Sequence, residues 1–137
     1  MSRRWYPQSN FYLSLHVGYP NAAGRISGSK QNLGGDIFLQ GNCVTIGCIP
    51  ITNEGIKEVY WLAVLARTAG QQRIPIQIFP TRLTGSGSDQ LATIQRNELD
   101  LISLWMNLRQ GFGYLEQHHR PPAVHVDRGG RYVFTGE

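Results

Sequence analysis

No run of about 18 apolar residues occurs in this sequence of 137 residues, so no segment is predicted to span a membrane. Charged residues are also few, at 16% against 41% hydrophobic residues, and this balance excludes an extended, highly charged disordered chain. The first five residues are basic, but no apolar segment of the signal-peptide type follows them. The length predicts a single globular domain over residues 1–137.

Lysine is scarce, because only Lys30 and Lys57 occur and arginine supplies nearly all of the positive charge. The formal net charge is +4, and the basic residues are scattered along the chain. A nucleic-acid-binding protein usually concentrates such residues on one face or in one segment, so we expect no nucleic-acid partner. A solvated basic surface and attraction to a substrate that carries a carboxylate are both compatible with this charge.

Cysteine occurs only at Cys43 and Cys48. No Cys-X-X-Cys pair and no Cys/His array with zinc spacing accompanies them, so no metal site is predicted. A disulfide between the two would need a geometry that the sequence does not guarantee. Cys43 fits the usual interpretation of an isolated cysteine, a small buried hydrophobic residue. Cys48 differs in that it follows Gly47 and precedes a predicted helix.

The pattern of apolar residues predicts an α+β fold of short strands with two helices. Strands are expected over residues 11–17, 36–40 and 74–79, and as a terminal hairpin of residues 123–126 and 131–134. Helices are expected from Glu54 to Gly70, capped by Thr52 or Asn53, and over about residues 89–108. Loops are expected over residues 22–35 and 84–88, and a short helical turn over residues 111–119.

The stretch from Gly34 to Thr52, GGDIFLQGNCVTIGCIPIT, resembles the active-site segment of murein L,D-transpeptidase catalytic domains of the YkuD type, in particular the YafK-like branch. That segment typically reads as Gly-Asp, a hydrophobic strand, His-Gly, a short loop, Gly-Cys and a helix. The similarity runs from about Tyr6 to Phe134. Family members carry further strands ahead of the position of Tyr6. The chain is therefore expected to be a truncated form of the family's sheet or sandwich, its C-terminal portion.

The resemblance implies a cysteine acyltransferase that acts on peptidoglycan stem peptides in the periplasm or cell envelope, with no cofactor. Cys48 would be the nucleophile and would form a thioester with the acyl donor. Gly47 permits a tight turn that could aim backbone N–H groups at an oxyanion. The positive end of the helix predicted after Thr52 would stabilise a thiolate at Cys48.

The sequence departs from the family at its base, because Gln40 stands where the family has its catalytic His. A glutamine side chain does not accept a proton at neutral pH, and loss of a general base commonly costs about 10²- to 10⁴-fold in rate. His16, on the Tyr12 and Ser14 face of the first strand, is the plausible substitute. A half-exposed strand histidine is the alternative interpretation.

Four further residues are predicted to bind the substrate: Arg25, Gly41, Asn42 and Thr45. Arg25 would bind a substrate carboxylate, with a solvated loop charge as the alternative. Asn42 and Thr45 would orient the substrate or satisfy the backbone of the turn. Two other functions are compatible with the same residues. The chain could be a catalytically silent relative that binds peptidoglycan or a partner, or a hydrolase or amidase of cell-wall peptide linkages.

Overall fold

The computed structural model describes residues 5–28, 33–43, 47–87, 91, 93 and 98–136, with the backbone alone for residues 5–9. These residues contain helices and strands, as the α+β prediction required. By their contacts they form two compact units, Met1–Asn21 with Gln31–Ile76 and Ala22–Lys30 with Gln77–Glu137. We describe each unit by itself. In the described ranges, no helix is long and apolar enough to cross a membrane.

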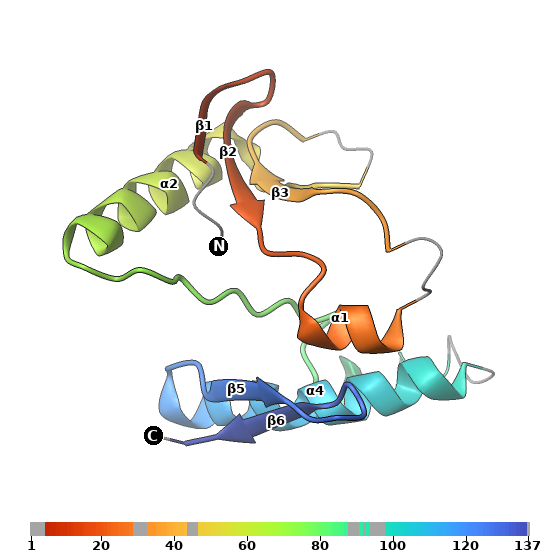
Figure 1. The fold of residues 1–137 in the computed structure, drawn as a ribbon. Helices are drawn as coiled ribbons and strands as arrows, with labels where there is room; N and C mark the ends of the chain where they lie inside the picture. The colour runs from red at the N-terminus through yellow and green to blue at the C-terminus, as the bar shows by residue number, and fades with distance from the viewer. Residues whose placement is uncertain are drawn as a thin grey trace. The chain divides into compact units, whose positions relative to one another are not determined.

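The first unit contains a four-stranded sheet in the order β1-β2-β3-β4 (Figure 1). Its strands are β1 (Trp5–Ser9), β2 (Tyr12–Val17), β3 (Ile37–Gln40) and β4 (Ile49–Pro50). β2 pairs antiparallel with both β1 and β3, whereas β3 pairs parallel with β4. The predicted strands at residues 11–17 and 36–40 are therefore confirmed, and β1 and β4 are additions to the prediction.

Helix α2 (Thr52–Thr68) covers one face of this sheet. Leu15 of β2 is buried against Ile56 and Ala63 of the helix, and partly buried residues surround them: Leu13, Leu39, Ile51, Val59, Tyr60 and Ile74. Because side chains alternate along a strand, Leu13 and Leu15 face the helix while Ser14 and His16 face the other way. Full burial of a side chain such as Leu15 or Ile56 stabilises the fold by about 1.5–3 kcal/mol.

The start of α2 has the capping interaction that the sequence predicts. The Thr52 hydroxyl accepts a hydrogen bond from the backbone N–H of Gly55, three residues further on, at 3.2 Å. Thr52 itself has a left-handed φ of 67°, so the chain turns sharply where the helix begins. The helix ends at Thr68, and Gly70 follows with a φ of 93°, as expected for a glycine that stops a helix.

The second unit contains α1 (Ala22–Ser27), α4 (Leu99–His118) and a hairpin of β5 (Ala123–Val126) and β6 (Tyr132–Thr135), which lies along α4 (Figure 1). The predicted terminal hairpin is confirmed. The buried Asn107 connects the hairpin to α4. Its side-chain N–H donates to the carbonyl of Tyr132, and its side-chain oxygen accepts from the N–H of Tyr132, both at 2.8 Å. A side-chain amide thus provides partners for two backbone groups of the strand.

Two predictions for the connecting segments are wrong. Part of the expected loop over residues 22–35 is helix α1, in which Ala23 is buried. The expected strand over residues 74–79 has no regular secondary structure. Isoleucines alternate there as in a strand, but a strand also needs a partner for its backbone groups, and Pro75 has no N–H to donate.

The prediction that a helix ends near residue 108 and a short turn follows at 111–119 is also wrong, because α4 continues unbroken from Leu99 to His118. Gly111 lies inside this helix and not at its end. A Cβ at Gly111 would lie 2.8 Å from Cδ1 and 2.9 Å from Cζ of Phe134 on β6. Glycine is therefore present because the ring of Phe134 packs against the helix backbone.

This packing predicts opposite effects for two glycines of α4. Gly111→Ala should lower the free energy of unfolding by about 1–3 kcal/mol, because the added methyl group overlaps Phe134. Gly113→Ala should raise it by about 0.5–1 kcal/mol, because a Cβ there meets nothing within 4 Å and alanine favours the helix. Urea unfolding of the two variants measures both values. Stabilisation by Gly111→Ala equal to that by Gly113→Ala would refute the packing of Phe134.

Candidate functional site

The candidate site lies where β3 ends and the chain turns toward β4. Gln40, the last residue of β3, is only 2% exposed. Its carbonyl accepts a hydrogen bond from the N–H of Ile51 at 2.9 Å, and the N–H of Gly41 donates to the Leu13 carbonyl at 3.1 Å. The strand end is therefore held on both sides, by β2 and by the segment that leads into α2.

Gly41 is the most crowded position of this turn. A Cβ added there would lie 2.6 Å from the carbonyl oxygen of Phe11, 2.7 Å from Oδ1 of Asn53 and 3.2 Å from Cγ2 of Ile56. These atoms come from the β1–β2 turn and from α2. Only glycine allows the three segments to approach this closely. Gly41 is buried and its role in the structure is to permit packing, so its predicted role in substrate binding stays a prediction.

Asn42 uses its polar groups within the turn. It adopts a left-handed φ of 67°, and its side-chain oxygen accepts a hydrogen bond from the N–H of Cys43 at 2.7 Å. Its N–H donates to Oδ1 of Asn53 at 2.8 Å, and its carbonyl accepts from the N–H of Thr52 at 3.1 Å. Of the two roles predicted for Asn42, the structure shows the one that satisfies the turn backbone.

Sequence reasoning missed what Asn53 does in this turn. The sequence predicts Thr52 or Asn53 as the cap of α2; Thr52 has this role, and the Asn53 side chain bonds the backbone of Asn42 and lies against Gly41. The sequence signal is the pair Gly41-Asn42, followed by Asn53 at the start of the predicted helix. Such a pair becomes informative only when the fold brings the two segments together.

Cys48 directly precedes β4 and is partly buried, whereas Cys43 is exposed. The prediction that Cys43 is a buried hydrophobic residue is wrong, because Cys43 follows the left-handed Asn42 in a surface turn. Both cysteines are thiols and not a disulfide. Gly47 has a φ of 139°, a conformation that side-chain-bearing residues rarely adopt, so the predicted sharp turn before Cys48 is present.

The strand register relates Cys48 to Gln40. In the parallel pair of β3 and β4, Leu39 lies beside Ile49 and Gln40 beside Pro50. Residues two apart on a strand share a face, so a register extended by one residue would bring Cys48 onto the Gln40 face, beside Phe38.

His16 lies on β2, opposite Phe38 of β3. Its Nε2 is 3.0 Å from Oδ1 of Asp36, and its ring packs edge-on against Phe38 with the ring centroids 5.2 Å apart. Ser14 pairs with Gln40 in the same register, so His16 and Gln40 share a face of the sheet. β3 lies between β2 and β4, so two strand spacings, about 10 Å, separate the backbone of His16 from that of β4.

The roles of the two remaining predicted residues, Arg25 and Thr45, stay predictions. Arg25 lies on α1 in the second unit, whereas Cys48 lies in the first. Thr45 lies outside the described residues. Among the residues that are described, no group of three or more His, Cys, Asp or Glu side chains is arranged to hold a metal ion.

The crowding at Gly41 generates a stability prediction. Gly41→Ala should lower the free energy of unfolding by about 1–3 kcal/mol, because two oxygen atoms and a methyl group would have to move. Gly35→Ala is the matched control, since a Cβ there meets nothing within 4 Å, and it should change stability by less than about 0.5 kcal/mol. Equal urea midpoints for Gly41→Ala and the parent chain would show that the three segments do not meet at this glycine.

Comparison with known proteins agrees with the resemblance predicted from the active-site segment. No protein-family model matches the sequence. The chain is 34% identical, over 130 residues, to a protein named "Putative L,D-transpeptidase YafK" from Escherichia coli strain K12, and equally to the protein of that name from Escherichia coli O157:H7. The match covers 94% of this chain and 49% of each relative, so the chain spans about half the length of these relatives. The chain is thus similar, over nearly its whole length, to about half of a YafK protein, as the resemblance of the segment from Gly34 to Thr52 predicted.

Proposed function

We propose that residues 1–137 form an L,D-transpeptidase-like catalytic domain that transfers an acyl group from a peptidoglycan stem peptide through a thioester at Cys48. The observation that carries this proposal is the similarity, over 94% of the chain, to the two Escherichia coli proteins named "Putative L,D-transpeptidase YafK". The turn at Gly47 and the partial burial of Cys48 support it, since a nucleophile must be both accessible and held in position. The proposed substrate assigns the activity to the cell envelope, on its periplasmic side.

In this reaction the Cys48 thiolate attacks the carbonyl carbon between the third stem residue and a terminal D-alanine. A carbon–sulfur bond forms, the carbon–nitrogen bond breaks, and D-alanine leaves after it gains a proton at nitrogen. An amine then attacks the thioester to form a new amide and release the thiol, whereas attack by water gives hydrolysis. As the resemblance implies, backbone N–H groups that the turn at Gly47 aims at the reacting carbonyl would stabilise the oxyanion of both steps.

This chemistry also needs a general base that accepts the proton of the Cys48 thiol. Gln40 is buried at the end of β3, beside Pro50 of β4, and its amide can donate a hydrogen bond but not accept the thiol proton. His16 can accept a proton, but about 10 Å of sheet separate its backbone from β4, and direct transfer needs about 3 Å or one bridging water. The geometry therefore favours a slow enzyme over one in which His16 replaces the base.

The second candidate function is a catalytically silent relative that binds peptidoglycan or a partner. The buried Gln40 at the family's His position favours it. A third candidate function, a hydrolase or amidase of cell-wall peptide linkages, would use the same residues and differ only in the acceptor of the acyl group.

The restoring substitution Gln40→His tests the proposal. It should raise acylation of Cys48 by roughly 10²-fold or more, because it returns a general base to the strand end next to the cysteine turn. The measurement is the intact mass of the protein during incubation with a muropeptide that carries a tetrapeptide stem. The adduct should have the mass of the tetrapeptide donor less D-alanine and should map to Cys48.

Matched variants identify the groups involved. In the Gln40→His background, Cys48→Ala should abolish the adduct and Cys43→Ala should leave it intact, although Cys43 is the more exposed thiol. Should Gln40→His have no effect while His16→Ala lowers the rate of the parent chain, the base is His16. If no adduct forms in any variant, the chain is a silent relative and the acyltransferase proposal is wrong.

A further inference from the structure

The hairpin of β5 and β6 in the second unit has a hydrogen-bond pattern that its register and one turn bond fix. Facing residues of an antiparallel ladder alternate between pairs that exchange backbone hydrogen bonds and pairs that do not. The N–H of Asp127 donates to the Arg131 carbonyl at 3.0 Å, so the pair nearest the turn is a bonded one. Two residues further along β5, His125 faces Val133. By the alternation this pair is bonded as well, and the backbone groups of His125 are used within the hairpin.

The pairs that lie between these do not exchange backbone hydrogen bonds. Val126 faces Tyr132, and Val124 faces Phe134. The N–H and carbonyl of Tyr132 bond the side chain of Asn107 on α4, as expected for groups that point away from β5. By the same alternation, the N–H and carbonyl of Val124 and of Val126 point away from β6. Within the described residues, no hydrogen bond is made to these groups at the outer edge of β5.

The outer edge of β5 is short, and it carries no Asp, Glu, Lys or Arg from residue 121 to residue 126. Val124 is 41% exposed there, and His125 is exposed as well. Pro122, two residues before Val124, is buried and has no N–H to donate. At the other end the strand stops at Val126 and the chain turns. Natural proteins usually protect an open strand edge with charges or a partner, and this edge has no charge of its own.

We propose that the outer edge of β5 pairs antiparallel with the same edge of a second copy of the chain, around a two-fold axis at His125. Val124 of each copy then faces Val126 of the other, and the outward N–H groups and carbonyls of both residues all find partners. The edge is self-complementary, because its two outward-facing residues lie symmetrically on either side of His125. A longer strand from another protein would meet the missing N–H of Pro122. The two hairpins form one continuous sheet in the order β6-β5-β5-β6.

The side chains along this contact suit the pairing. Val124 and Val126 share the face of Phe134, which packs against α4, so Val124 of each copy lies beside Val126 of the other. The two His125 residues face each other in a non-hydrogen-bonded pair, in which Cα atoms lie about 4.5 Å apart. So short a ladder buries less than the roughly 1,200–2,000 Å² of a stable interface, and we therefore expect a weak dimer that forms only at high concentration.

Disulfide trapping tests the register. In a chain that carries Cys43→Ala and Cys48→Ala, His125→Cys should form a disulfide-linked dimer in air, because facing Cα atoms about 4.5 Å apart lie within the range that a disulfide spans. Thr135→Cys is the matched control. Thr135 is exposed on the same face of the hairpin but belongs to β6, away from the two-fold axis, so this variant should stay unlinked. Non-reducing electrophoresis of both variants gives the comparison.

Hydrogen exchange tests the backbone contact in the parent chain. At high protein concentration the amides of Val124 and Val126 should exchange at least about 10-fold more slowly than in dilute protein, because they become hydrogen-bonded only in the dimer. The His125 amide is bonded to β6 and should be protected at both concentrations. Val124→Pro should abolish association in sedimentation velocity and leave the hairpin folded, since the N–H that it removes points to the free edge.

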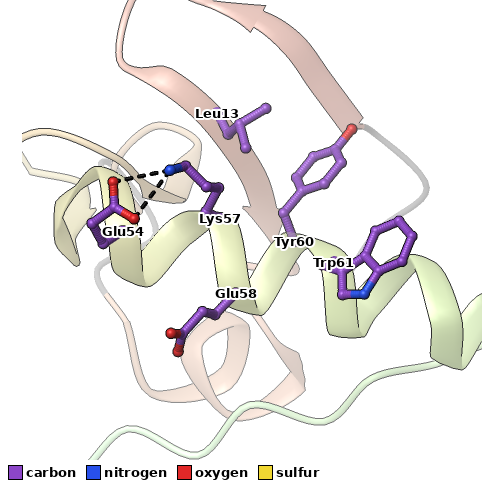
Figure 2. Close-up of a pocket in the computed structure, with 6 residues that line it drawn as sticks. All are labelled: Leu13, Glu54, Lys57, Glu58, Tyr60 and Trp61. Atoms are coloured by element: carbon purple, nitrogen blue, oxygen red, sulfur yellow. Dashed lines mark hydrogen bonds and ion pairs between the residues drawn. The ribbon is translucent and has the colours of Figure 1, made fainter.

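A groove on the first unit is the competing contact surface (Figure 2). It lies beside α2, and Trp61, one of the residues that line it, is 62% exposed. His125→Glu should abolish association, because it places two carboxylates opposite each other, whereas Trp61→Glu should leave it unchanged. The reverse result assigns the contact to the groove and overturns the proposal. A chain that stays monomeric at millimolar concentration, or equal linkage of the two cysteine variants, overturns it as well. None of these outcomes depends on acylation of Cys48.

Discussion

The close approach at Gly41 is the constraint on which the first unit depends. The Phe11 carbonyl, the Asn53 amide and the Ile56 methyl group all converge on the space that a side chain would occupy. Because these atoms belong to the β1–β2 turn and to α2, one glycine relates the hairpin, the end of β3 and the helix to each other. The left-handed Asn42 and its hydrogen bond with Asn53 follow from the same approach.

The two faces of the sheet in this unit carry different kinds of side chain. One face carries Leu13 and Leu15 and is buried under α2. The other carries Ser14, His16 and Gln40, of which Ser14 and Gln40 are 4% and 2% exposed. Because residue 40 is buried, its own side chain decides which chemistry is possible at this position. A glutamine amide there gives hydrogen bonds without proton transfer.

The candidate site belongs to the first unit, where the Gly41 N–H bonds the Leu13 carbonyl of β2. The second unit is stabilised differently, with a buried Asn107 that bonds strand backbone and a glycine that admits Phe134. The relatives from Escherichia coli are about twice as long as the matched segment.

The sequence by itself determined the elements whose signal is local. Alternating apolar residues predicted β2 and β3, the Gly129-Gly130 pair predicted the terminal hairpin, and a three-to-four-residue apolar repeat with Thr52 ahead of it predicted α2. The motif around Cys48 also predicted the similarity to L,D-transpeptidases. The sequence signals for these strands and for the helix lie within a few residues of one another, so they can be recognised without knowledge of the fold.

The tertiary structure decided the features that depend on a distant partner. Residues 74–79 alternate like a strand but form none, because strand formation needs a neighbour to pair with. Gly111 sits within a helix because Phe134 packs there, and Asn53 bonds Asn42 because the fold brings α2 to the end of β3. The exposure of Cys43 and of Trp61 likewise follows from which surfaces other segments cover. No local pattern carries that information, since burial is a property of the assembled chain.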